Sequence, residues 1–161
     1  MRAVLKYCEE GHRRELPEGT VIIHEGSSTG HLFVLIEGQL EVVKGDTVVA
    51  SLTEAGAIVG EMSCLLQLPH TATVRVAKIS SVYEINDAAE FLRMQPAVAF
   101  YIAKMLAQRL NVATSYLADI KRQYEGHGSH LSMVSEVLAS MVNLPPSEVS
   151  PGSDLRSDPR V

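Results

Sequence analysis

The sequence lacks tryptophan and has few aromatic residues, with five tyrosines and three phenylalanines among its 161 residues. It also lacks an apolar run of about 18 residues, which is the length that a membrane-spanning helix needs. Its first residues, MRAVLKYCEEGHRRE, carry charges too early for a secretory signal peptide. We therefore expect a cytoplasmic protein that does not enter a membrane.

Metal-binding and redox motifs are also missing. Cys8 and Cys64 are the only cysteines, so a four-cysteine metal or iron–sulfur site is excluded and a disulfide framework is not expected. His127 and His130 lie in a Gly/Ser-rich segment with no carboxylate or thiol beside them. We predict no metal site and, because no catalytic Ser–His–Asp or paired-carboxylate spacing is visible, no enzyme.

Excess positive charge is absent as well. The formal net charge is −5, whereas proteins that hold nucleic acid by charge present a basic face. The net charge of the whole chain does not by itself exclude a local basic patch. We predict no nucleic-acid partner.

What the sequence does contain, from 20 to 85, is a series of short β-rich runs separated by turn residues. The runs are 20–26, 31–38, 39–52, 53–60 and 71–85, with Gly38 expected to end the second and the last run expected to form two strands. The clearest is a hairpin at 39–52 that turns around Lys44-Gly45-Asp46. Strands at this spacing predict a β-sandwich, jelly roll or barrel.

Helices are expected on both sides of these strands. Residues 3–9 form one or two turns, and Asp87 is a good N-cap for a helix after it. Pro96 suits the first turn of a long helix that runs to about Tyr124. Apolar residues follow a heptad spacing along this helix: Ala99, Ala103, Leu106, Leu110, Ala113, Leu117, Ile120 and Tyr124.

This seam favours a partner helix, most simply in a homodimer through 99–124, over packing on the chain's own strands. After Gly126 we predict a second amphipathic helix within 126–143, and a disordered tail at 144–161, which is rich in proline, serine and aspartate. The predicted organisation is thus a domain at 1–125, the extra helix and the tail.

The segment IVGEMSCLLQLPHTATVRV, residues 58–76, differs from ordinary core sequence. Gly60 permits close approach of a ligand, and the N–H groups that begin a helix at Glu61 attract a phosphate. A carboxylate beside a phosphate is unfavourable unless Glu61 accepts a sugar hydroxyl instead. Taken alone, Gly60-Glu61 could also be a simple helix start with an acidic first turn.

The longer motif is more specific. Residues 60–74, GEMSCLLQLPHTATV, resemble the phosphate-binding cassette of cyclic nucleotide-binding domains, and 16–42 and 107–120 resemble that family's opening strands and long C-terminal helix. The resemblance implies an α+β, mainly β fold. This is a jelly-roll β-barrel with a short helix in the cassette and flanking N- and C-terminal helices.

The resemblance also implies a 3′,5′-cyclic nucleotide ligand. Glu61 would accept the ribose 2′-OH, and Thr114 or Ser115 would contact the purine. The cyclic phosphate would be held by Gly60, Met62, Ser63, Thr71 and Ala72, with Thr73 completing the motif. Thr71 fits cGMP and cAMP binders, and we favour cAMP because the long helix is similar to that of bacterial members.

One position departs from the pattern. The family places a phosphate-pairing arginine where this chain has His70. An arginine is permanently charged and bidentate, so its loss should weaken binding by about one to two orders of magnitude. A protonated His70 could replace it in part.

The residues therefore leave two main functions open. The first is a non-catalytic sensor, expected to stand alone without a DNA-binding domain, that moves its C-terminal helices and signals to a dimer or to an unidentified protein partner. The second is a degenerate fold that binds no nucleotide and serves as a protein–protein interaction domain. A cupin-like enzyme is disfavoured because the strands are too apolar to supply a metal cluster.

Overall fold

The computed structural model describes residues 2–123, 134, 136–137 and 139–140. The chain divides into two compact units, Met1–Ile102 and Ala103–Val161. In the described residues no helix is long and apolar enough to span a membrane. The predicted helix at 126–143 is helical at its described positions, while the rest of it and the tail at 144–161 lie outside the described residues.

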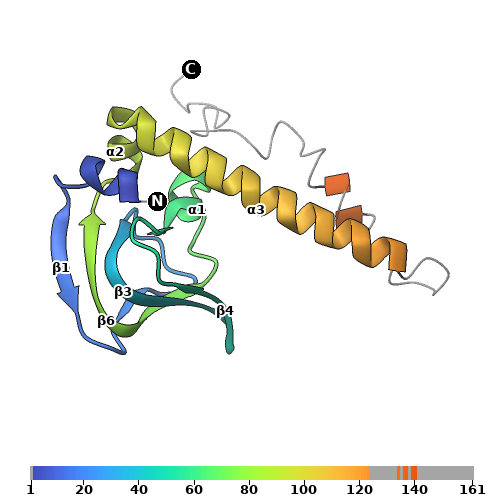
Figure 1. Cartoon of the computed structure of the whole chain (residues 1–161), viewed down its shortest axis with the longest axis horizontal. Coiled ribbons are helices and arrows are strands. Elements are labelled where there is room, and N and C mark those ends of the chain that lie inside the picture. The colour runs from blue at the N-terminus through green and yellow to red at the C-terminus, as the bar shows by residue number, and fades with distance from the viewer. Residues whose placement is uncertain (1, 124–133, 135, 138, 141–161) are drawn as a thin grey trace, which may run out of the picture. The chain divides into compact units, whose positions relative to one another are not determined.

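The first unit is built on an antiparallel sheet (Figure 1). Its strands are β1 (His12–Leu16), β2 (Val21–Ile23), β3 (Leu32–Lys44), β4 (Thr47–Leu52), β5 (Ile58–Val59) and β6 (Thr73–Ile85). The main order is β1-β6-β3-β4, with β2 paired to β6 and β5 paired to β3. This mainly β arrangement confirms the predicted fold class.

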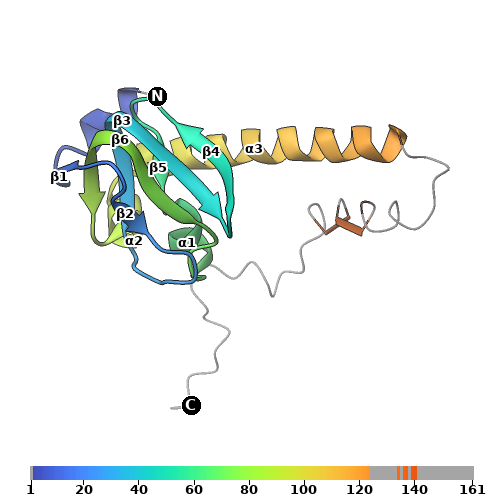
Figure 2. The ribbon, with the colours of Figure 1, turned by 90° about the horizontal axis from the view of Figure 1, so that it is seen from below.

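The helices are η1 (Arg2–Tyr7), α1 (Glu61–Leu66), α2 (Ala88–Met94) and α3 (Pro96–Gln123). Asp87 caps α2 as predicted, because its side chain accepts a hydrogen bond from the Glu90 N–H. Pro96 begins α3, which continues to Gln123, and the predicted end at about Tyr124 lies outside the described residues. The α1 and α2 helices contact each other, as Figure 2 also shows.

The strands bury side chains on both faces where β3 begins. Phe33 and Leu35 join a core cluster, while Leu32 and Val34 point to the opposite face and are buried as well. The cluster also contains Leu16, Ile23, Leu40, Ala57, Val59, Val74, Val76 and Val82. Buried side chains of η1, α2 and the first turns of α3 are Val4, Ala88, Leu92, Val98 and Ile102.

Three strand predictions were wrong. Gly38 does not end a strand but lies inside β3, with a φ of 105° at a point where the register with β6 shifts. A side chain there would collide with Ser80. The run at 71–85 is one strand rather than two, since β6 continues through it.

The third error is β1, which was not predicted. Its residues HRREL are mostly charged and exposed, so the sequence carries no apolar alternation. Pairing with β6, from His12 opposite Glu84 to Leu16 opposite Ser80, holds it at the edge of the sheet.

Candidate functional site

The start of α1 requires glycine at position 60. Gly60 is the N-cap residue, with a φ of 94°, a region that L side chains rarely adopt. A Cβ at this position would lie 2.5 Å from the His31 carbonyl oxygen, so the backbone of α1 and the chain before β3 approach as closely as a glycine allows. No side chain caps this helix start. Its first N–H groups therefore lack the side-chain acceptor that most helices provide.

Glu61 is the first residue of α1 and is only 4% exposed. A carboxylate buried to this extent is unusual, and Glu61 interacts with a neighbouring group there. Met62 is exposed, and the Ser63 hydroxyl donates to the Leu68 carbonyl at 2.6 Å, which closes the far end of α1. The Ser63 side chain is thus engaged within the cassette itself.

His70 is 5% exposed and is held by the loop that precedes β3. Its Nε2 lies 2.9 Å from the Thr29 Oγ1. Its backbone N–H donates to the Ser27 carbonyl, and its carbonyl accepts from the Gly26 N–H, both at 2.8 Å. Both backbone and ring of His70 are therefore fixed against residues 26–29.

The environment of His70 favours the neutral imidazole. Burial, and then the neighbouring His31, lower the pKa of His70 below its ordinary value of 6.5. Thr29 also accepts a hydrogen bond from the His31 N–H at 3.2 Å, so this one hydroxyl is shared by the two histidine residues. The surroundings of His70 thus favour an uncharged imidazole among polar loop residues.

The rest of the motif leads into β6. Thr71 is exposed and Ala72 is half-buried. Thr73 begins β6, and its Oγ1 accepts a hydrogen bond from the Glu25 N–H at 3.1 Å. Gly60–Ser63 therefore form the start of α1, and His70–Thr73 connect its far end to β6, all within the first unit.

Thr114 and Ser115 lie on α3 in the second unit. The Thr114 hydroxyl donates to the Leu110 carbonyl one turn earlier, at 2.7 Å. Their expected contact with a purine stays a prediction.

The 26–30 loop is the element that sequence reasoning missed. This loop supplies the partners of His70, a role that the sequence analysis did not assign to it. The two glycines that bound GSSTG were the available signal, since small residues allow close backbone approach.

No group of three His, Cys, Asp or Glu side chains is placed to hold a metal ion among the residues that the structure describes. The described cassette offers backbone N–H groups, one buried carboxylate and one buried imidazole. These groups can bind a ligand that combines an anion with a hydroxyl donor.

The model of the cyclic nucleotide-binding domain family matches residues 13–95, just over half of the 161 residues. The chain belongs to this family. The matched range includes α1 and His70, so the cyclic nucleotide-binding domain contains the whole cassette.

Solved structures support the same fold. The catabolite activator protein of Thermus thermophilus matches with a TM-score of 0.62 and 22% identity, covering 91% of this chain and 78% of that one. A protein from a cyclic-GMP-dependent signalling pathway in bacterial phytopathogenesis matches with a TM-score of 0.59 and 19% identity, covering 69% and 94%.

The CBD2 of PKAR, bound to Sp-2Cl-cAMPS, matches with a TM-score of 0.53 and 22% identity, covering 67% of this chain and 75% of that one. At these identities the likeness is one of fold. No curated protein gives a significant match to the sequence. As a member of this family, the chain is a cyclic nucleotide-binding regulatory module.

Proposed function

We propose that this domain is a non-catalytic sensor that binds a 3′,5′-cyclic nucleotide, with cAMP favoured over cGMP. The observation that carries the proposal is the start of α1, where Gly60 in the left-handed region is followed by the buried carboxylate of Glu61. A cyclic nucleotide has a phosphate for the N–H groups of α1 and a ribose 2′-OH for Glu61.

In the proposed complex, Gly60, Met62, Ser63, Thr71 and Ala72 hold the phosphate. Thr73 supports the motif by joining β6 to Glu25. Thr114 or Ser115 contacts the purine, and the preference for cAMP rests on the similarity of the long helix to that of bacterial members. The signal is a shift of the C-terminal helices that changes a homodimer formed through 99–124, or a surface offered to a protein partner.

His70 is the residue of this site that fits phosphate binding least well. Its environment lowers its pKa and favours the neutral form, and its ring is bonded to Thr29, whereas an arginine would bring a permanent charge to the phosphate. This observation favours the second candidate function, a domain that binds no nucleotide and acts through protein–protein contacts. In the first function the cassette binds cAMP or cGMP, and in the second it binds neither nucleotide.

The deciding experiment is mass spectrometry of any nucleotide released from the purified protein, followed by calorimetric titration with cAMP and cGMP. His70→Arg is the companion variant, and we expect it to tighten cAMP binding by about one to two orders of magnitude. Binding of neither nucleotide to the native protein or to His70→Arg would overturn the sensor and leave the interaction domain.

A further inference from the structure

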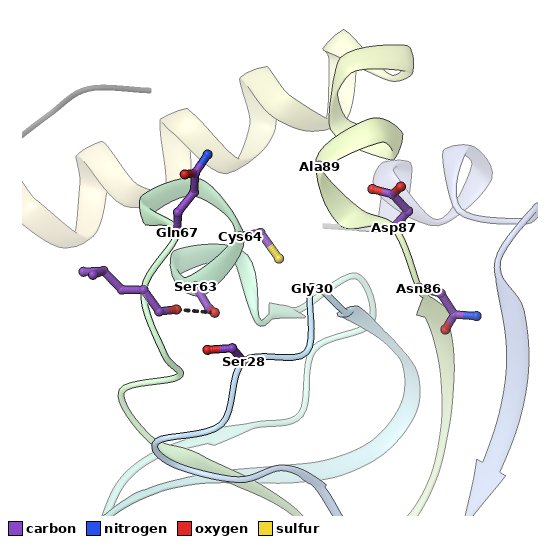
Figure 3. A pocket seen from close by; sticks show the side chains of 9 residues that line it. Ser28, Gly30, Ser63, Cys64, Gln67, Asn86, Asp87 and Ala89 are labelled. Carbon is purple, nitrogen blue, oxygen red and sulfur yellow. Dashed lines mark hydrogen bonds between the residues drawn. The ribbon is translucent and has the colours of Figure 1, made fainter. Parts of the chain in front are cut away.

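A cavity of about 440 Å³ lies between α1, the loop before β3 and the start of α2, all within the first unit (Figure 3). Neither Glu61 nor His70 lines it, and Ser63 is the one residue that it shares with the proposed phosphate contacts. Its volume falls in the range of about 300–1,000 Å³ that is typical of small-molecule sites. The wall on one side is α1, so the cavity and the cassette share this helix.

The walls of the cavity are fixed to one another by hydrogen bonds. The Ala88 N–H donates to the Gly30 carbonyl at 3.0 Å, which ties the loop to α2. The Cys64 thiol on α1 lies 3.7 Å from the His31 carbonyl oxygen, which ties α1 to the same loop. The cavity is therefore a preformed feature of the unit.

The polar groups of the lining are suited to a cation. Asp87 supplies a carboxylate at the α2 end of the lining, and Ser28 supplies a hydroxyl at the other end. The Ser63 hydroxyl donates to the Leu68 carbonyl, and the Asn86 and Gln67 side chains point away from the Asp87 carboxylate. None of the described residues that line the cavity is basic. Burial, and then the carboxylates of Glu61 and Asp87, raise the pKa of the Cys64 thiol, so the potential in this region is negative.

Gln67 adds a conformational observation. It is the one described non-glycine residue with a positive φ, at 53°, and it ends α1 at the edge of the cavity. A left-handed residue is a common way for a helix to end, and it fixes the end of α1 at the edge of the cavity.

We propose that this cavity is a second ligand site, which binds a small organic amine in its ammonium form. The ammonium group donates to the Asp87 carboxylate, whose Oδ1 also accepts the Glu90 N–H. The carbon chain of the amine lies against the apolar part of the lining, which comes from Cys64, Leu68 and Ala89. An anion of the same size is repelled by Asp87.

The test is an NMR titration of the isotope-labelled full chain in the absence of nucleotide, so its outcome does not depend on the proposed cassette function. The probes are n-butylamine, 1-butanol and butyrate, which share a carbon chain and differ in charge. We expect n-butylamine to shift the amide signals of Ser28, Gly30, Cys64 and Ala89, with weaker binding of 1-butanol and none of butyrate.

Asp87→Asn is the decisive variant, because asparagine caps a helix as well as aspartate does but carries no charge. We expect it to weaken n-butylamine binding about tenfold. The matched control is Asp119→Asn, which removes a charge from the exposed surface of α3 and should leave the binding unchanged. A second variant, Ala89→Leu, fills the cavity with a good helix former and should abolish binding.

Two results overturn the proposal. One is equal affinity for n-butylamine and 1-butanol, or an affinity for n-butylamine that Asp87→Asn does not change. The other is binding of N-acetyl-lysine methylamide without binding of n-butylamine, which would assign the cavity to a lysine of a protein partner.

Discussion

His70 Nε2 and Thr29 Oγ1 lie 2.9 Å apart and join two segments that are 41 residues apart in the sequence. The contact places the residue that replaces the family's arginine inside a loop, where its ring already has a partner. A phosphate must therefore compete with Thr29 for the imidazole, or bind beside a neutral His70. The first two predictions separate these possibilities.

The unliganded protein should lose stability at acid pH through His70. The pKa of His70 is lowered below 6.5 by burial and by His31, so the unfolded chain takes up the proton first. The free energy of unfolding should fall as the pH decreases below 6.5 and through the pKa of the folded state. Urea unfolding between pH 7.5 and 5 measures this slope.

In the same experiment His70→Gln should flatten the slope, because glutamine does not titrate. His12→Gln is the control, since the His12 side chain is exposed and its loss should leave the slope in place. A native slope that persists in His70→Gln would show that another group causes it.

Binding of cAMP should tighten as the pH decreases from 8 to 6. A phosphate next to His70 favours the charged imidazole and raises its pKa in the complex above the low value of the free protein. The affinity gain therefore begins near the pKa of the complex and ends below that of the free protein. Calorimetric titration between pH 8 and 6 measures the affinity for cAMP. An affinity that does not change over this range would show that His70 does not contact the phosphate and stays bonded to Thr29.

Gly60→Ala should be strongly destabilising. The new Cβ meets the His31 carbonyl at 2.5 Å in a left-handed backbone, and together these cost about 2–4 kcal/mol of unfolding free energy. Gly45→Ala is the matched control, because it also has a positive φ but nothing within 4 Å of the added Cβ. It should cost about 1–2 kcal/mol. Equal losses in denaturant unfolding would show that the close approach at Gly60 contributes nothing.

Alternation and turn chemistry predicted much of the sheet. The hairpin around Gly45 was visible because β-branched residues flank a turn glycine, and Val42 does pair opposite Ala50. The strand β1 was not visible, because its charged residues are held by β6 rather than by their own burial. The prediction for Gly38 was wrong because the sequence does not distinguish a glycine that ends a strand from one inside a strand. In the structure Gly38 lies inside β3 and leaves room for the Ser80 side chain.

Part of the candidate site could likewise be predicted from the sequence, and part of it could not. The cassette motif predicted that a helix begins at Glu61 directly after Gly60, because the signals of a helix start are local, and α1 does begin there. The partners of His70 could not be predicted, since the contact with Thr29 depends on how two distant segments meet. A short loop of serine, threonine and glycine carries no periodic pattern that indicates which residue it will bind.

Glu61→Gln should weaken cAMP binding about tenfold, because a neutral amide replaces a charged acceptor of the ribose 2′-OH. The control is a ligand, 2′-deoxy-cAMP, which lacks that hydroxyl. The native protein should bind it about as weakly as the variant binds cAMP, and the variant should lose little further. Additive losses in this double-mutant cycle, measured by calorimetry, would exclude a contact between Glu61 and the 2′-OH.

Leu110→Glu should dissociate the proposed homodimer. Leu110 lies within the heptad seam of α3 and is 45% exposed, so a partner helix would cover an apolar side chain that water now reaches. A glutamate there places a charge in the seam, and analytical ultracentrifugation should show a monomer. Val112→Glu is the control, because Val112 is more exposed, at 68%, but lies off the seam. A native protein that sediments as a monomer, or a dimer that Val112→Glu disrupts equally, would contradict pairing through this face.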